Sequence, residues 1–411
     1  MRALVVAHGH PDFGAGGGEI AAYGLFRALR AHPGVEAADF LARTAEPRLV
    51  VGGVGRLREN EYLVRRDTAD WLRLAAAPDE ARAGRRLPDL LAALRPDAVF
   101  VHHVAHLGLG LLGEIRASLP AARIVLTLHD FLGICAHRGL MVTAGEAPAL
   151  CEAAAPERCR ACLPSHPTSA FAERRRLVLA AFARADRFVA PSRFLAGRYR
   201  DWGLPLERLA VIANGTEPAE PLPLGSGEPL RLGMFGQLRP EKGLHVLLAA
   251  LHHLAGPERA RLRLVVSGSR LEAQDGIYRE LVRRLAEPLE GEGVLSWRGA
   301  YGRGELAARM AEIDLVAVPS TWWENAPLVI GEAFAHGRPV LAIRRGGMAE
   351  MVRDGVDGLL VDDGGAPAFA AAIRRFLADP ELARGLARGI RPPPTPADMA
   401  ETYLALARGI A

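Results

Sequence analysis

Lysine is nearly absent from this sequence of 411 residues: of its 51 basic residues, 50 are arginine and one, Lys242, is lysine. Such a bias indicates that arginine fills every ordinary solvent-facing basic position. A retained lysine is therefore a candidate for a role that arginine cannot take, because lysine offers a compact point charge and arginine a planar fork. The alternative is that this single lysine has remained by chance. The surroundings of Lys242 distinguish the two explanations.

Long hydrophobic runs are also missing. The longest uncharged run, Ala98 to Gly113, carries three histidines and is too short and too polar to span a bilayer. The chain opens with the strand-like Met1 to Ala7, without the basic region or cleavage site of a signal peptide. We therefore expect a cytoplasmic protein, at most peripheral on the cytoplasmic face of a membrane.

Aromatic residues are scarce, at 6% of the chain, and they do not alternate with basic residues as in nucleic-acid modules. We therefore expect no nucleic-acid partner. Residues 1–213 hold 28 Arg against 22 Asp and Glu, a net charge of +6, and the remainder holds 23 basic against 25 acidic residues, a net charge of −2. The basic first half suits an anionic acceptor or a membrane surface, although most of its arginines are expected to be solvated.

What the sequence does contain is a repeated alternation of short apolar runs with helical patterns, which predicts an α/β protein with two doubly wound domains. The expected boundaries are a first domain over 1–213, a linker over 214–229, a second domain over 230–390, and a last helix within 391–411 that crosses back to the first domain. Two such domains would face each other across a cleft at the carboxyl ends of their sheets, where ligands bind in this architecture.

The most specific segment runs from Thr321 to Phe334 and follows an expected strand. Pro327 suits a helix start, where free backbone amides form an anion site. Glu324 precedes that start and Glu332 lies one to two turns inside the helix. Because carboxylates accept hydrogen bonds from vicinal hydroxyls, this spacing predicts a ligand with a sugar, a diphosphate and a ribose.

The spacing from Glu324 to Glu332 closely resembles the retaining glycosyltransferases of family 4, which have the GT-B fold, in the group related to glycogen synthases and phosphatidylinositol mannosyltransferases. Further matching motifs, each weak alone, follow in the family's order along nearly the whole chain. They are Gly16-Gly17-Gly18-Glu19, Leu128-His129-Asp130, Pro191-Ser192, Asn214-Gly215, Arg239-Pro240-Glu241-Lys242-Gly243 and Trp297-Arg298-Gly299.

The resemblance implies transfer of a sugar from a nucleotide-diphosphate sugar to a polysaccharide, glycolipid or natural-product acceptor, with front-face attack, retention and no catalytic metal. It implies that the first domain selects the acceptor and the second binds the donor. Arg239 and Lys242 would bind the diphosphate, Glu324 the sugar hydroxyls and Glu332 the ribose diol. The catalytic set that it implies is His129, Arg239, Lys242 and Glu324.

The other donor-binding positions come from the same resemblance. The backbone of the helix start would support the sugar and phosphates, Arg298 would flank the base, and two glycines of the first loop would close on the ligand from the first domain. These positions are Gly17, Gly18, Arg298, Asn325, Ala326, Pro327, Leu328 and Val329.

Other readings remain beside this one. The loop from Gly14 to Glu19 looks like a dinucleotide fingerprint, but Glu19 stands where the last glycine belongs, so we reject NAD binding there. A GT-B sugar-nucleotide epimerase and a non-catalytic sugar-nucleotide-binding protein stay open as alternative functions. An acceptor-side base could lie among the histidines near the ends of the expected strands or at Asp130, and none is assigned.

The four cysteines, Cys135, Cys151, Cys159 and Cys162, fall within 28 residues of an expected insertion over about 132–164. Cys159-x2-Cys162 has the spacing by which two thiolates bind one metal, and two more thiols complete four ligands. We expect a structural metal, zinc first and an iron–sulfur cluster second, with four reduced thiols as the alternative.

Overall fold

The computed structural model describes residues 1–14, 16–46, 48–50, 53–76, 86–145, 148–225, 228–362 and 364–410. Outside the described residues lie Ala15 of the expected glycine-rich loop, residues 77–85, two residues each of the cysteine-rich insertion and of the expected linker, and the terminal Ala411. The chain divides into two compact units, one of Met1–Gly215 with Pro394–Ala411 and one of Thr216–Pro393.

Unit 1 is built on an eight-stranded sheet in the order β10-β9-β8-β7-β1-β2-β4-β3, in which only β3 runs antiparallel to its neighbour. Strand β7 is buried throughout and β1, β8 and β9 are buried after their first residue, which is why they read as apolar runs. The strands are β1 (Arg2–Ala7), β2 (Ala37–Thr44), β3 (Val54–Arg58), β4 (Glu61–Arg65), β7 (Ala98–Val101), β8 (Arg123–Thr127), β9 (Arg187–Ala190) and β10 (Leu209–Val211). A separate pair, β5 (Thr68–Asp70) and β6 (Ala75–Ala76), lies outside this sheet.

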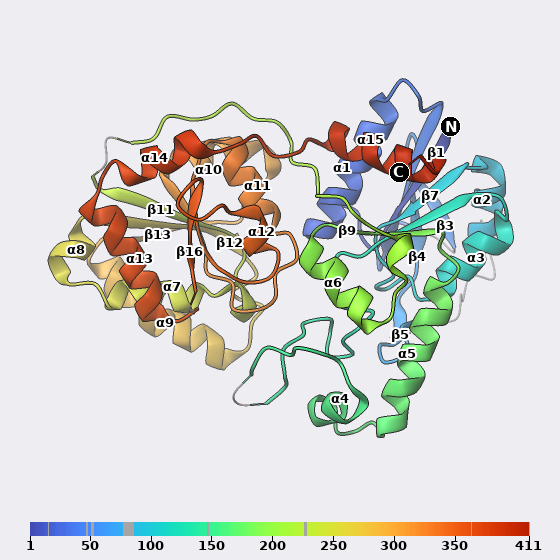
Figure 1. The fold of residues 1–411 in the computed structure, drawn as a ribbon, viewed down its shortest axis with the longest axis horizontal. Coiled ribbons are helices and arrows are strands. Elements are labelled where there is room, and N and C mark those ends of the chain that lie inside the picture. Colours follow the sequence, from blue (N-terminus) through green and yellow to red (C-terminus); the bar gives the residue numbers. More distant parts are fainter. Residues whose placement is uncertain are drawn as a thin grey trace. The chain divides into compact units, whose positions relative to one another are not determined.

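The helices of unit 1 are α1 (Gly17–Ala31), α2 (Leu87–Leu94), α3 (Gly110–Ser118), α4 (Pro156–Cys162), α5 (Thr168–Phe182), α6 (Arg193–Trp202) and α15 (Pro396–Arg408). Most of them flank this sheet, whereas α4 lies apart from it and packs on α5 (Figure 1). The C-terminal helix α15 packs on α1 and against β8, and the Tyr403 hydroxyl lies 2.9 Å from Thr127 Oγ1. The expected return of the last helix to the first domain is therefore present.

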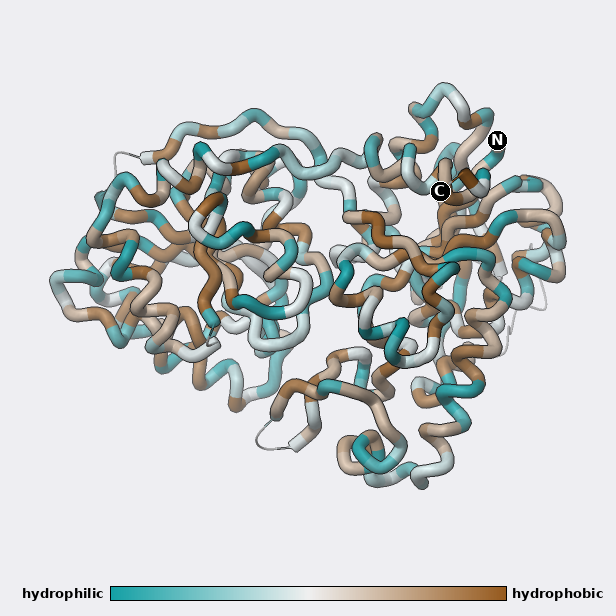
Figure 2. The backbone as a smooth tube through the Cα atoms, in the orientation of Figure 1, coloured by the Kyte–Doolittle hydropathy of each residue, from teal (hydrophilic) through white to brown (hydrophobic). Residues whose placement is uncertain are grey.

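Unit 2 has a six-stranded, wholly parallel sheet in the order β13-β12-β11-β14-β15-β16, and Figure 2 shows hydrophobic segments along its strands. Its strands are β11 (Leu230–Gln237), β12 (Leu262–Ser269), β13 (Leu295–Gly299), β14 (Leu315–Val318), β15 (Val340–Ile343) and β16 (Gly358–Val361). Its helices are α7 (Leu244–His252), α8 (Gly256–Ala260), α9 (Gly276–Gly291), α10 (Leu306–Ala311), α11 (Leu328–Ala335), α12 (Met348–Met351), α13 (Ala366–Ala378) and α14 (Leu382–Gly389).

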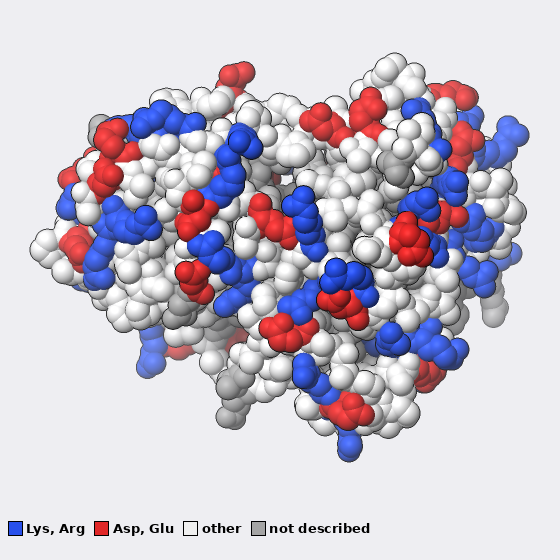
Figure 3. All heavy atoms as spheres, in the orientation of Figure 1, with Lys and Arg blue, Asp and Glu red and all other residues white. Residues whose placement is uncertain are grey.

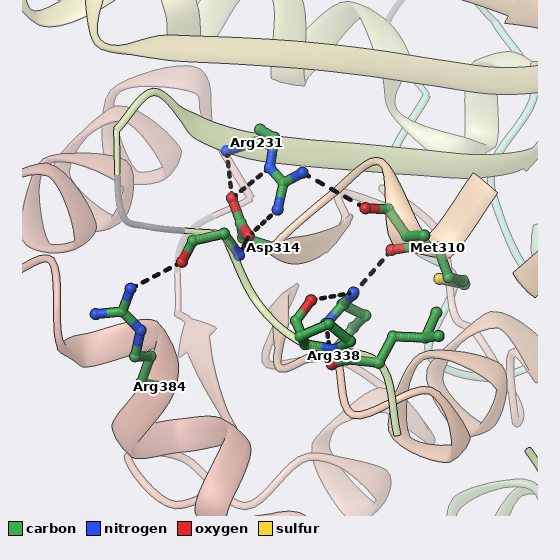
Figure 4. Close-up of polar contacts among 9 residues, drawn as sticks. Arg231, Met310, Asp314, Arg338 and Arg384 are labelled. Atoms are coloured by element: carbon green, nitrogen blue, oxygen red, sulfur yellow. Dashed lines mark hydrogen bonds and ion pairs between the residues drawn. The ribbon is translucent and has the colours of Figure 1, made fainter. Parts of the chain in front are cut away.

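Part of the expected linker is bound tightly to unit 2 by a buried arginine. Arg338 donates hydrogen bonds to the carbonyls of Met310, Leu222 and Pro223 at 2.9, 2.8 and 3.0 Å. Figure 4 shows the Arg338 guanidinium among these groups, beside the pair of Arg231 and Asp314. Burial lowers the pKa of Arg338 to about 10, and these carbonyls provide the partners that a buried cation needs.

Charges of both signs alternate over the face drawn in Figure 3. Peripheral contact with an anionic membrane therefore stays a prediction from the net charge of the first half. In the part of the chain that the structure describes, no helix combines the length and the apolar character needed to cross a bilayer.

Candidate functional site

The loop that carries Lys242 is fixed against the end of β14 in unit 2. It contains the short 3-10 helix η2 (Pro240–Lys242), and Gly243 follows with a φ of 77°. A side chain at Gly243 would be strained by that φ and would collide with the Pro319 carbonyl oxygen. The Thr321 amide donates to the Glu241 carbonyl at 2.9 Å. The two loops that were predicted to bind the donor are therefore held together by their backbones.

Lys242 and Glu324 form the centre of this site. Lys242 Nζ donates to Glu324 Oε1 at 2.6 Å, and Ser320 Oγ donates to the same oxygen at 2.8 Å. Burial alone would raise the pKa of Glu324, but Lys242 and these hydrogen bonds outweigh burial and leave the pKa below its ordinary value. Lys242 Nζ also lies 5.3 Å from the centre of the Trp322 ring, in cation–π range. Glu324 is thus an ionised carboxylate with a fixed cation beside it.

The backbone of Glu324 is held from behind by the loop after β15. The Gly347 amide donates to the Glu324 carbonyl at 2.7 Å, and Gly346, with a φ of 56°, lies so close that a Cβ there would meet the same carbonyl. Arg345 Nη1 donates to the Thr321 carbonyl at 2.6 Å. The position of the Glu324 carboxylate is therefore set by packed backbone as well as by the hydrogen bonds of its side chain.

Helix α11 starts directly after this loop. Pro327 is the N-cap rather than the first helical residue, and the helix ends before Gly337, whose φ is 70°. The amides of Leu328 and Val329 are at the start of the helix, where amides have no partner within it. Burial raises the pKa of Glu332 in this helix, and Arg303 opposes that rise.

The two arginines predicted for the site, Arg239 and Arg298, each pair with a glutamate. Arg239 lies weakly against Glu241, with Nε 3.4 Å from Oε2. Arg298 pairs with Glu312 at 2.7 Å, and no contact joins it to another predicted donor residue among those described. Tyr301 and Arg303, to which no sequence motif pointed, interact with Glu332. The loop after β13 that holds them has no residue pattern that would have revealed them.

In unit 1, the predicted residues gather at the carboxyl ends of β1, β7 and β8. Gly17 and Gly18 form the first turn of α1. A Cβ on Gly18 would lie 3.3 Å from the His8 ring and 3.5 Å from the His129 ring. Glu19 lies 3.1 Å from His8 Nε2. Burial alone would raise the pKa of Glu19, but the hydrogen bond and charge of His8 outweigh it and lower the pKa to about 2.

His129 belongs to a histidine cluster. Its Nε2 lies 3.0 Å from His102 Nδ1, and the two rings are stacked. Burial lowers the pKa of His102 to about 3 and that of His129 well below its ordinary value, so both rings are neutral at pH 7. His103 Nε2 lies 3.1 Å from Asp130 Oδ2, and although burial lowers the pKa of His103, Asp130 raises it further. His129 is therefore suited to hydrogen bonding rather than to providing a positive charge.

The four cysteines all line one cavity of about 20 Å³ in unit 1, and no disulfide joins them. Burial and the neighbouring thiols raise the pKa of Cys159 to about 11. Among the described residues, no group of three or more His, Cys, Asp or Glu side chains is arranged to hold a metal ion. The metal centre expected from the cysteine spacing is therefore not supported by this arrangement.

Comparison with known proteins places both units in glycosyltransferase families. The family described as Glycosyltransferase Family 4 matches residues 15–220, and the family described as Glycosyl transferases group 1 matches residues 223–391. A putative colanic acid biosynthesis glycosyltransferase, WcaL, of Salmonella typhimurium is 29% identical over 47% of this chain and 48% of its own length. A D-inositol 3-phosphate glycosyltransferase of Streptomyces bingchenggensis is 31% identical over 50% of this chain and 48% of its own length. The chain spans about half the length of the curated relatives that it matches.

Solved structures show the same fold along the whole chain. A HepE protein of Anabaena in complex with UDP covers 100% of both chains with a TM-score of 0.67 and 18% identity. The sucrose-phosphate synthase of Thermosynechococcus elongatus covers 100% of this chain and 97% of its own, with a TM-score of 0.66 and 20% identity. The expected GT-B fold is confirmed, and the chain belongs to glycosyltransferase family 4.

Proposed function

We propose that this protein transfers a sugar from a nucleotide-diphosphate sugar to an acceptor hydroxyl with retention of the anomeric configuration. The observation that carries the proposal is the Lys242–Glu324 pair, held 2.6 Å apart beside the start of α11. Unit 2 therefore brings together a carboxylate that can bind sugar hydroxyls, and a cation and helix-start amides that can bind a diphosphate.

The Lys242–Glu324 pair leaves N–H groups of Lys242 available to bind the diphosphate. The Lys242 ammonium has three N–H groups and gives one to Glu324, so the others can bind diphosphate oxygens. Departure of a nucleoside diphosphate develops negative charge. Lys242, Arg239 and the amides of Leu328 and Val329 would stabilise that charge without a metal. Glu332 would take the ribose diol, with Tyr301 and Arg303 beside it.

Retention by front-face attack is consistent with the state of Glu324. Oε1 of Glu324 accepts hydrogen bonds from both Lys242 and Ser320, which suits a carboxylate that holds sugar hydroxyls, and front-face attack needs no protein nucleophile. The departing phosphate oxygen would then take the acceptor proton, and the neutral His129 would hydrogen-bond the sugar from unit 1. The colanic acid, inositol phosphate and lipopolysaccharide relatives favour a polar polysaccharide, glycolipid or sugar-like acceptor.

The experiment that tests the proposal is a screen of UDP-, GDP- and ADP-sugars by thermal stabilisation and slow donor hydrolysis. Solved neighbours are complexes with UDP, with UDP and glucose, and with UDP-glucose, so UDP-sugars come first. We expect the nucleotides of one base to raise the Tm of the protein. We also expect slow hydrolysis to release the sugar from the matching nucleotide sugar. A folded sample that no nucleotide stabilises would contradict donor binding.

Further outcomes separate the alternatives. Conversion of the nucleotide sugar to its epimer without an acceptor would favour the epimerase. Binding without hydrolysis or transfer to any acceptor would favour the non-catalytic protein. Once an acceptor is found, NMR of the first-formed product measures the anomeric configuration, and inversion would contradict the retaining mechanism.

A further inference from the structure

A second cavity of unit 1, with a volume of about 360 Å³, is lined by the cysteine-rich insertion and by the helices α5 and α6. Its volume is within the range of about 300–1,000 Å³ that is typical of small-molecule sites. The insertion contributes one wall around the start of α4, a helix that has no buried residue and packs on α5. Ala154, Ala155 and Pro156 of this wall are half-buried, so they are accessible to a ligand in the cavity.

Most of the lining of this cavity is apolar. Ile134, Phe171 and Trp202 are buried, and alanines and a proline complete the apolar walls. Water gains little from contact with such walls, whereas a hydrocarbon group that covers them is removed from water itself. The walls therefore favour a ligand with an apolar body.

Arg174 of α5 is the buried cation of this cavity. It lines the cavity and is only 3% exposed. Its Nη1 donates to the carbonyls of Trp71 and Leu72, and its Nη2 donates to the carbonyl of Leu132. Its Nε has no hydrogen-bond partner among the described residues. Because a guanidinium stays charged and neutral carbonyls do not cancel its charge, an anionic ligand would stabilise this buried group.

Arg175 provides a second cation at the exposed side of the same cavity. Its Nη2 donates to the Trp202 carbonyl at 2.9 Å, and its guanidinium carbon lies 5.7 Å from the centre of the Trp202 ring, in cation–π range. A guanidinium has five N–H groups, so these contacts fix it and leave donors for a further acceptor. The residues that line this cavity are all described, and none of them is an aspartate or a glutamate.

The two kinds of wall together define the ligand. A bare anion would leave the apolar walls unfilled, and a hydrocarbon alone would leave the charges of Arg174 and Arg175 unpaired. We propose that this cavity binds an amphipathic anion, an apolar chain with a phosphate or carboxylate at one end, with the chain on the apolar walls and the anion at the two arginines. The site goes beyond the proposed sugar transfer and does not rest on it.

The test uses the full chain and octyl phosphate at concentrations below micelle formation, without nucleotide. Calorimetric titration is expected to give one site per chain, and the tryptophan fluorescence is expected to change because Trp202 lines the cavity. Octanol lacks the charge and inorganic phosphate lacks the chain, so each should bind at least about tenfold more weakly. Absence of octyl phosphate binding, or equal binding of either partial probe, would overturn the proposal.

Variants locate the ligand. Arg174 also holds backbone carbonyls, so its removal is expected to affect folding, and Ala172→Trp is the sharper test. This substitution adds bulk to the lining from an exposed position and should abolish binding. Arg175→Gln should weaken binding about tenfold, the effect of one lost charge-assisted hydrogen bond. Arg176→Gln, an exposed neighbour outside the lining, is the matched control and should bind normally.

Unchanged binding of octyl phosphate in Ala172→Trp or in Arg175→Gln would refute this location. Nucleotide stabilisation of the same variants reports on the donor site of unit 2, so failure of the proposed sugar transfer would be seen separately. Vesicles of phosphatidylcholine with phosphatidic acid distinguish two sources of the ligand. Sedimentation with vesicles that Ala172→Trp abolishes would assign the cavity to a membrane lipid, and octyl phosphate binding without sedimentation would assign it to a free amphiphile.

Discussion

At the scale of single residues, the lone lysine has surroundings that account for its retention. Lys242 Nζ lies 2.6 Å from Glu324 Oε1 and 5.3 Å from the centre of the Trp322 ring. A planar guanidinium is larger and fixes its donors in a fork, so it would not repeat the geometry by which the ammonium meets Glu324 and Trp322. The sequence could reveal the rarity of this lysine, but only the structure shows its salt bridge with Glu324.

We therefore predict that Lys242→Arg folds with a Tm close to that of the unchanged protein but loses transfer activity by about 10²-fold, the magnitude of a lost transition-state donor. The loss is expected mainly in kcat. The matched control is Arg284→Lys, an exposed exchange of the same two residue types on α9. Near-full activity of Lys242→Arg would show that the rarity of lysine carries no functional meaning.

The pair of Glu19 and His8 gives a pH dependence at the same scale. The folded pKa of Glu19, about 2, is below its ordinary value of 4.5, so the ionised form stabilises the fold above pH 4.5, and this stability is lost as pH falls toward 2. Two and a half pKa units correspond to about 3 kcal/mol. Glu19→Gln should therefore cost most near pH 5.5 and progressively less toward pH 3.

Urea unfolding of both proteins between about pH 5.5 and pH 3 measures this difference. Glu207→Gln, at an exposed position, is the control and should give a small, constant difference. A cost of Glu19→Gln that does not shrink on acidification would mean that packing at α1, not charge, explains it.

At the scale of elements, the repeated short apolar runs predicted two parallel-rich α/β sheets, because a strand covered on both faces has no polar alternation. The strands β2 and β3 are harder to recognise from the sequence, because Asp39, Arg43 and the arginines of β3 interrupt their apolar pattern. For the site, the resemblance to family 4 predicted Glu324 and Lys242 as neighbours of one ligand. It could not predict Tyr301 or Arg303, because their proximity to Glu332 depends on how β13 lies beside β12.

The turn between η2 and α7 gives the prediction at this scale. Gly243→Ala would place a methyl group against the Pro319 carbonyl at a φ of 77°, so the loop with Lys242 must move. We expect a loss of about 1–3 kcal/mol in stability and weaker nucleotide binding. Gly276→Ala, at the first position of α9 with open space around it, is the control and should change neither. Denaturant unfolding and calorimetric titration with the nucleotide measure the two effects.

At the scale of the whole molecule, the chain leaves unit 1, forms unit 2 and returns to complete unit 1. The last helix is therefore part of the core of unit 1 although it follows unit 2 in sequence. Tyr403 of α15 is buried, bonds Thr127 at 2.9 Å and stacks on His102, whose ring in turn contacts His129. The C-terminus thus supports the histidine cluster that was predicted to contact the sugar.

Tyr403→Ala should therefore destabilise unit 1 by about 3–5 kcal/mol, the cost of truncating a buried aromatic side chain. Hydrogen exchange followed by mass spectrometry can locate the effect, because a local loss of stability accelerates exchange in the elements that depend on it. We expect faster exchange in α1 and β8 and unchanged exchange in β11 and β12. Thr402→Ala, on the exposed side of the same helix, should leave both units unchanged. Equal acceleration in both units would show that they unfold as one cooperative body, and α15 would then stabilise the donor unit as well.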